Sequence, residues 1–131
     1  MTCSITRTFE FSAGHTLADH PGKCRLLHGH NYRLEVTIEG RLNSQGMVMD
    51  FGDLKTEVMT ILDPIDHHFL IWNEDPRRVA LLSADPSSII LVSWPPTVEH
   101  LAQWIQGLLE DELGRDVSII LWETEDAYAS V

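Results

Sequence analysis

The stretch from residue 32 to residue 39 alternates apolar and polar side chains without interruption, and no other feature constrains the fold as strongly. Successive side chains of a β-strand point to opposite faces of a sheet, so strict alternation predicts a strand with one buried face. Residues 4–13 alternate in the same way and predict a preceding strand. The apolar positions of the two strands are Ile5, Phe9, Phe11, Tyr32, Leu34, Val36 and Ile38.

Two later segments have helical periodicity. Asp50 can cap a helix that ends before Pro64. Thr97 can cap a second helix, which Gly114 closes at its C-terminal end. The apolar faces of these helices are Phe51, Leu54, Val58, Ile61 and Leu62, and Val98, Leu101, Ala102, Ile105, Leu108 and Leu109.

The remaining strand signals complete the order of elements. Residues 88–94 and 117–124 predict strands, and residues 128–131 predict a short last strand that pairs back. Because strands and helices do not alternate in repeated crossover units, this order favours an α+β fold, an antiparallel sheet with helices on one face. We expect a single domain over residues 1–131, since no linker or repeat divides the chain.

Charge and composition exclude several classes of partner. Nine Lys and Arg against twenty Asp and Glu give a formal net charge of -11, which argues against binding nucleic acid. No apolar run approaches the roughly 20 residues that cross a bilayer, and the first residues lack the apolar core of a signal peptide. We therefore expect a cytoplasmic protein without a membrane partner, in which Cys3 and Cys24 stay reduced. Cys3 is given no role.

Three of the seven histidines lie where the first strand ends and the second begins. His28 and His30 point to one side, because Gly29 takes the other, and His15 keeps the parity of the buried face of its own strand. Three imidazoles with one open coordination position are typical of catalytic zinc, whereas magnesium and calcium prefer oxygen ligands. The pattern predicts a zinc site. Histidines that satisfy backbone groups or face water are the alternative.

Cys24 is a candidate reactive thiol. It lies between Lys23 and Arg25, whose positive charges favour the thiolate, the reactive form of the side chain. A small buried hydrophobic side chain is the alternative, and the flanking cations argue against it.

Asp66 and His67 form a candidate proton relay, with His68 as the rival histidine. An aspartate beside a histidine can fix its tautomer and stabilise the imidazolium during proton transfer. Since neighbouring side chains diverge in a regular strand, the relay requires an irregular turn. A polar loop without function is the alternative.

Glu123 places a carboxylate at the end of the apolar face of the predicted strand 117–124, where it needs a partner. A planar ligand with adjacent N–H donors could bind both carboxylate oxygens. A solvated strand end or a salt bridge is the alternative.

A series of motifs along nearly the whole chain resembles the 6-pyruvoyl-tetrahydropterin synthase family, which includes the bacterial 6-carboxytetrahydropterin synthases of the queuosine pathway. The motifs are Phe11-Ser-Ala-Gly-His15, Cys24 followed by His28-Gly-His30-Asn31-Tyr32, Gly46 to Asp50-Phe51, Ile65-Asp66-His67, Pro96-Thr97-Val-Glu99 and Glu123-Thr124. The cysteine, His-Gly-His, Asp-His and Glu-Thr motifs together are highly specific.

The resemblance implies roles for individual residues. It implies that His15, His28 and His30 bind Zn²⁺, that Cys24, Asp66 and His67 are catalytic, and that Glu123, Thr124 and Glu99 bind the substrate. It also implies the tunnelling fold, a four-stranded antiparallel sheet with two helices on one face. In that family the sheets assemble into a barrel, here expected as a homo-oligomer, a hexamer of two trimers with active sites at subunit interfaces.

The implied substrate is 7,8-dihydroneopterin triphosphate, and the first expectation is a 6-carboxytetrahydropterin synthase. The three residues between Cys24 and His28 resemble that branch, whereas the residues after Thr124 lack its cysteine-containing tail. The alternatives are a 6-pyruvoyl-tetrahydropterin synthase, which eliminates triphosphate, and a non-catalytic pterin- or purine-binding member of the same fold. A structural protein held together by metal is a further alternative.

Two departures from compact bacterial relatives stand out. The segment from Trp72 to Trp94 looks longer and is expected to add an edge strand, an interface or a lid. The net negative charge of the chain would also repel a triphosphate, so positively charged side chains must lie close to the substrate. The available cations are Lys23, Arg25, Arg33, Lys55, Arg77 and Arg78.

Overall fold

Two long antiparallel strands form the centre of the fold, which is described here by a computed structural model covering residues 1–131. The strands are β1 (Cys3–His15), β2 (His28–Gly40), β3 (His68–Trp72), β4 (Ile89–Val92), β5 (Ser118–Thr124) and β6 (Ala127–Ser130). The helices are α1 (Phe51–Leu62), α2 (Arg78–Ala84) and α3 (Val98–Leu113), with short 3-10 turns η1 (Lys23–Arg25) and η2 (Pro86–Ser88).

The strands form one six-stranded sheet in the order β4-β3-β1-β2-β5-β6. β1 and β2 pair along their whole length, from Cys3 opposite Gly40 to His15 opposite His28. β2 pairs antiparallel with β5, and β5 pairs antiparallel with β6. The strands expected at residues 88–94, 117–124 and 128–131 are therefore present as β4, β5 and β6.

The expected four-stranded antiparallel sheet is wrong in strand number and in direction. β3 runs parallel to β1, and β4 runs parallel to β3, so the sheet is mixed. The first of these pairings involves only Ala13, Gly14 and His15 of β1. Just before it, the backbone N–H of His67 donates to the carbonyl of Ser12 over 2.7 Å and starts β3 along the edge of β1.

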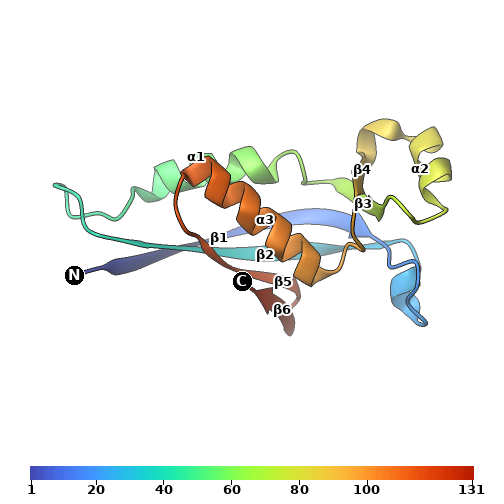
Figure 1. Ribbon diagram of the computed structural model, residues 1–131, viewed down its shortest axis with the longest axis horizontal. Helices are drawn as coiled ribbons and strands as arrows, with labels where there is room; N and C mark the ends of the chain where they lie inside the picture. The colour runs from blue at the N-terminus through green and yellow to red at the C-terminus, as the bar shows by residue number, and fades with distance from the viewer.

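Helices α1 and α3 lie on one face of the sheet, as expected, whereas α2 lies with β3 and β4 at one end of the molecule (Figure 1). The Asp50 side chain caps α1 by accepting from the backbone N–H groups of Gly52 and Asp53. Thr97 caps α3 by accepting from His100, and Gly114 ends α3 with a φ of 63°, the left-handed conformation that glycine adopts readily. The predicted helix boundaries are confirmed.

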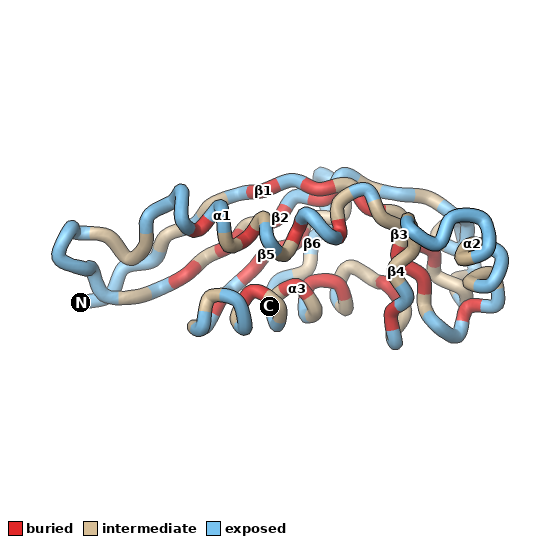
Figure 2. The backbone as a smooth tube through the Cα atoms, turned by 90° about the horizontal axis from the view of Figure 1, so that it is seen from above, coloured by how far each residue is buried: buried red, intermediate tan, exposed pale blue.

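The core lies between this helix pair and the sheet. Buried and exposed positions alternate along β1 and β2, so one face of each strand packs inward (Figure 2). Phe51, expected on the apolar face of α1, is 50% exposed, because the core begins one turn later. The core residues of the helices are Leu54, Val58, Leu62, Leu101, Ala102, Ile105 and Leu109.

The opposite face of the sheet is polar and carries cross-strand hydrogen bonds. The hydroxyls of Thr6 and Thr37 lie 2.6 Å apart, and the Ser12 hydroxyl donates to the Asn31 side chain over 2.7 Å. None of the helices combines the length and the apolar character that crossing a bilayer requires.

Candidate metal centre and active site

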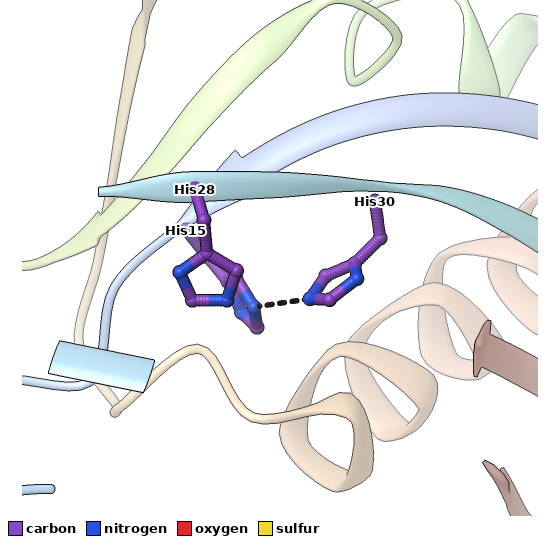
Figure 3. A group of neighbouring side chains, drawn as sticks. All are labelled: His15, His28 and His30. Carbon is purple, nitrogen blue, oxygen red and sulfur yellow. Dashed lines mark hydrogen bonds between the residues drawn. The ribbon is translucent and has the colours of Figure 1, made fainter. Parts of the chain in front are cut away.

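The β1–β2 pairing gathers three histidines at the end of the buried face. His15 lies directly opposite His28, and His30 lies opposite Ala13 on the same side of β2. One nitrogen of each of the three rings lies within 4.8 Å of the others. Figure 3 shows the three rings converging from β1 and β2. The chain thus brings together the histidines that the sequence pattern singles out.

Backbone carbonyls orient two of these rings. His15 Nδ1 donates to the carbonyl of Pro96, and His28 Nδ1 donates to the carbonyl of Leu26, each over 2.7 Å. A carbonyl oxygen only accepts, so both Nδ1 atoms carry the proton and each Nε2 is left with a lone pair. His15 Nε2 and His30 Nε2 lie 3.1 Å apart. This set of imidazole donors fits a zinc ion.

Burial favours the neutral form of His15 and His30 by lowering the pKa of each. His15 is 3% exposed, and burial lowers its pKa from 6.5 to about 4 against the opposing effect of the hydrogen bond to Pro96. The neighbouring His28 and His30 lower the pKa of His15 further. Burial also lowers the pKa of His30, although Glu123 opposes the shift. Neutral imidazole is the form that binds a metal ion.

Glu123 lies beside this histidine cluster. Its two carboxylate oxygens approach His15 Nε2 and His30 Nε2 to 4.0 and 3.8 Å. An open groove of about 640 Å³ passes along Glu123, His30 and Trp122. The Arg33 guanidinium, which also lines the groove, stacks 4.8 Å from the Trp122 ring centre. The alternation of side chains along β5 therefore places the Glu123 carboxylate in the wall of a groove that His30 also lines.

Thr124 and Glu99 form no side-chain hydrogen bond or ion pair with the histidine cluster. The Thr124 hydroxyl donates to the Asp126 carboxylate over 2.9 Å, across the turn between β5 and β6. Glu99 is exposed in the first turn of α3. Of the residues expected to bind substrate, the structure places only Glu123 at the cluster.

Asp66 and His67 form a hydrogen-bonded pair. His67 Nδ1 lies 2.9 Å from Asp66 Oδ1, and the backbone N–H of Ser12 donates to the same oxygen over 2.8 Å. The hydrogen bond from Ser12 is the main reason that the pKa of Asp66 is lowered, with a further contribution from His67. His68 instead contacts the Asp66 backbone carbonyl over 2.9 Å. His67, not His68, is the partner of the carboxylate.

An unusual backbone conformation makes this pairing possible. His67 has a φ of 63°, and it is the only residue other than glycine with a positive φ. The irregular turn that the relay requires is therefore present, directly before β3. The His67 side chain is 80% exposed, and no hydrogen bond or ion pair joins the Asp66–His67 pair to the histidine cluster within the chain.

Cys24 lies in η1, on the loop of residues 16–27 that joins β1 to β2. Cys24 is half-buried and Cys3 is exposed, and the two thiols are not joined to each other. The backbone N–H of Leu17 donates to the carbonyl of Cys24 over 2.9 Å and closes the loop. The loop leads directly into His28 at the start of β2.

Sequence reasoning missed three groups near the site. The carbonyls of Pro96 and Leu26 orient metal-site histidines, but a backbone acceptor carries no sequence signal beyond the position of Pro96 within a motif. Arg77, counted among the cations available to a triphosphate, is instead bound to the carboxylate of Asp75 through Nε at 3.0 Å and Nη2 at 2.7 Å. The buried Asp75 was not singled out at all.

Known proteins share both the sequence and the fold. The family model described as 6-pyruvoyl tetrahydropterin synthase matches residues 4–131. The 6-carboxy-5,6,7,8-tetrahydropterin synthase of Haemophilus influenzae is 41% identical over 133 residues, covering 95% of this chain and 94% of its own. A protein of the same name from Aquifex aeolicus is 33% identical over 157 residues, covering 98% and 97%.

Solved structures agree with these matches. An uncharacterized protein from Wolinella succinogenes has a TM-score of 0.84 at 27% identity, covering 100% of this chain and 98% of its own. The 6-pyruvoyl tetrahydropterin synthase of Caenorhabditis elegans has a TM-score of 0.77 at 24% identity, covering 100% and 95%, a likeness of fold alone. With the family match over residues 4–131, these findings show that the chain belongs to the 6-pyruvoyl tetrahydropterin synthase family.

Proposed function

We propose that this chain is a zinc-dependent 6-carboxytetrahydropterin synthase, which converts 7,8-dihydroneopterin triphosphate and water into 6-carboxytetrahydropterin, acetaldehyde and triphosphate. One carbon of the substrate side chain stays as the carboxyl group, and the other two leave as acetaldehyde. The observation that carries the proposal is the convergence of His15, His28 and His30 next to the Glu123 carboxylate. Relatives that match over nearly their whole length bear the name 6-carboxy-5,6,7,8-tetrahydropterin synthase.

The three histidines would hold the zinc ion through their Nε2 atoms. The carbonyls of Pro96 and Leu26 keep the rings of His15 and His28 in the required tautomer and orientation. When bound, zinc supplies a Lewis acid that lowers the cost of negative charge on a side-chain oxygen of the substrate. Three protein ligands leave a position for that oxygen.

Glu123 would anchor the pterin ring. An ionised carboxylate accepts two parallel hydrogen bonds from adjacent N–H groups, as on the guanidine-like edge of a pterin. The groove along Glu123 and His30 is open enough, at about 640 Å³, to admit a bicyclic ring. Thr124 and Glu99 are assigned supporting contacts to the substrate, which require rearrangement of the Thr124 hydroxyl away from Asp126.

Cys24 and the Asp66–His67 pair would move protons. As a thiolate, Cys24 takes a proton from the substrate carbon next to the polarised oxygen. His67, oriented by Asp66 at 2.9 Å, transfers a proton on the opposite side of the substrate. The carboxylate of Asp66 stabilises the imidazolium form while His67 carries that proton.

We further propose that the active protein is a homo-oligomer, a hexamer of two trimers with its sites at subunit interfaces. The 80% exposure of the His67 side chain supports this assembly, because a relay with no hydrogen bond or ion pair to the histidine cluster of its own chain can be completed by a second chain. Shared sites between subunits would also close the wide groove at Glu123.

Incubation of the zinc-loaded protein with 7,8-dihydroneopterin triphosphate tests the function. Mass spectrometry should detect 6-carboxytetrahydropterin and acetaldehyde. A 6-pyruvoyl-tetrahydropterin product would instead assign the chain to triphosphate elimination alone, an alternative that the lack of a cysteine after Thr124 favours. Unchanged substrate with zinc confirmed bound would refute the enzymatic proposal and leave a binding protein.

A further inference from the structure

The loop that carries Cys24 is held at Cys24 itself and at Leu26, two residues further along the chain. The carbonyl of Cys24 accepts from the backbone N–H of Leu17, at the start of the loop. The carbonyl of Leu26 accepts from His28 Nδ1 and so connects the loop to the histidine cluster. The backbone on either side of Arg25 is thus tied both to the end of β1 and to a metal-site histidine.

The carbonyl of Arg25, between these two, accepts two hydrogen bonds. The Thr16 hydroxyl donates to it over 2.7 Å, and Arg77 Nη1 donates to it over 2.5 Å. Arg77 Nη2 also donates to the Thr16 hydroxyl over 2.8 Å. The Arg77 guanidinium, the Thr16 hydroxyl and the Arg25 carbonyl are therefore each hydrogen-bonded to the other two. This network lies at Arg25, the residue directly after Cys24.

Asp75 holds the Arg77 side chain in this position. The carboxylate accepts from Arg77 Nε and Nη2, and it also accepts from the Arg77 backbone N–H over 2.9 Å. Asp75 is 1% exposed, and hydrogen bonds from Arg77 lower its pKa, so the pair stays ionised. A bidentate contact of this kind fixes both the position and the plane of the guanidinium.

The pair belongs to the segment between β3 and β4, which the sequence marks as longer than in compact relatives. The backbone N–H of Asp75 donates to the carbonyl of Trp72 over 2.9 Å, so the pair follows immediately after β3. β3 itself pairs with the end of β1 next to His15. The segment after β3 therefore contacts the Cys24 loop, and β3 itself is paired beside the histidine cluster.

We propose that Arg77, held by Asp75, is a positioning residue that fixes the Cys24 loop relative to the three histidines. The inference rests on the proposed function, because it takes Cys24 as the base. Small displacements of a reacting group can reduce turnover about 100-fold, so an enzyme whose Cys24 loop is released from Arg77 would lose activity without losing substrate contacts.

Loop measurements that need no turnover provide the first test. In a Cys3→Ser background, we compare Arg77→Ala with the parent by amide hydrogen exchange and by the alkylation rate of Cys24. We expect the amides of Leu17 and Leu26 to exchange at least about 10-fold faster and Cys24 to react faster with iodoacetamide. Exchange and alkylation within about twofold of the parent would overturn the proposal. Arg41→Ala, which removes an exposed arginine beyond the far end of β2, is the matched control.

Steady-state kinetics of the zinc-loaded variants provide the second test. We expect Arg77→Ala to lower kcat about 10- to 100-fold with KM within about threefold of the parent and the zinc content unchanged. A raised KM with unchanged kcat would overturn the positioning role and indicate a substrate contact. If Cys24→Ala keeps full turnover, the base assignment fails, whereas the exchange and alkylation results still decide whether Arg77 holds the loop.

Two less disruptive substitutions, Thr16→Val and Arg77→Lys, test the same proposal if Arg77→Ala does not fold. Thr16→Val leaves the Asp75–Arg77 pair and the direct hydrogen bond from Arg77 to the Arg25 carbonyl in place, and it removes only the hydroxyl that bonds to both Arg77 and Arg25. Arg77→Lys keeps the charge, but a compact ammonium cannot replace the planar group that reaches Asp75, Thr16 and Arg25 together. Both variants should raise amide exchange at Leu17, and parent-like protection in both would contradict the proposal.

Discussion

The Nδ1 atom of His15 donates a 2.7 Å hydrogen bond to the carbonyl oxygen of Pro96, 81 residues further along the chain. This bond joins the end of β1 to the segment that enters α3. It fixes the tautomer of a buried imidazole and directs the other ring nitrogen toward His30, 3.1 Å away. The metal site is therefore part of the packing between the sheet and α3.

Removal of single histidines should release the metal. We expect His28→Ala and His30→Ala to lower zinc affinity at least about 100-fold, because two imidazoles leave a site incomplete. Cys24→Ala should keep zinc and lose turnover. Metal content after dialysis, measured by plasma mass spectrometry, checks both outcomes, with Cys3→Ser as the control. Loss of zinc in Cys24→Ala would make the cysteine a ligand and contradict its role as a base.

The stability of the metal-free protein should depend on the protonation of His15. The folded-state pKa of about 4 lies below the unfolded value of 6.5, so the unfolded chain takes up the proton first as the pH falls. The contribution of the neutral His15 to the free energy of unfolding is fully present above about pH 6.5 and is lost as the pH falls toward 4. This loss amounts to at most about 3 kcal/mol. Urea unfolding at pH 7.5 and 4.5 measures this loss. His15→Gln should show a smaller pH dependence, and an equal dependence would refute the assignment to His15.

Asp66→Asn should separate the proton relay from metal binding. The amide keeps an acceptor for the backbone N–H of Ser12 but cannot stabilise an imidazolium at His67. We expect kcat to fall at least about 100-fold with the zinc content unchanged. Asp63→Asn, an exposed position at the end of α1, serves as the control in the same steady-state assay. Unimpaired turnover in Asp66→Asn would exclude the relay.

Glu123→Gln should weaken substrate binding. An amide offers one acceptor where the carboxylate offers two, so we expect a 10- to 100-fold rise in the substrate Kd, measured by calorimetry with zinc bound. Glu125→Gln changes a neighbouring exposed acid that lines the same groove and should have little effect. Because Glu123 lies 3.8 Å from His30 Nε2, loss of zinc with unchanged substrate affinity would identify Glu123 as a metal ligand instead.

The parts of the fold that depend on local chemistry could be predicted from the sequence. The Asp50 and Thr97 caps act within one helical turn, and the alternation in β1 and β2 places His15, His28 and His30 on one face. Side-chain parity and chain direction suffice for these elements.

The missing parts depend on contacts between distant segments. β3 is five residues long and pairs with β1 in parallel, which no local pattern specifies. The carbonyl of Pro96 reaches His15 only after the chain has folded, and Arg77 reaches Arg25 across 52 residues. Periodicity describes neighbours along the chain, so it cannot reveal such partners.

The left-handed backbone conformation at His67 lowers the thermal stability of the protein while it places the imidazole for catalysis. An imidazole-bearing residue in that conformation costs about 1 kcal/mol or more relative to glycine, and the turn into β3 maintains it. Directed evolution that selects for thermal stability alone should therefore recover glycine or asparagine at position 67. Each of these variants should have a lower turnover, because it lacks the imidazole.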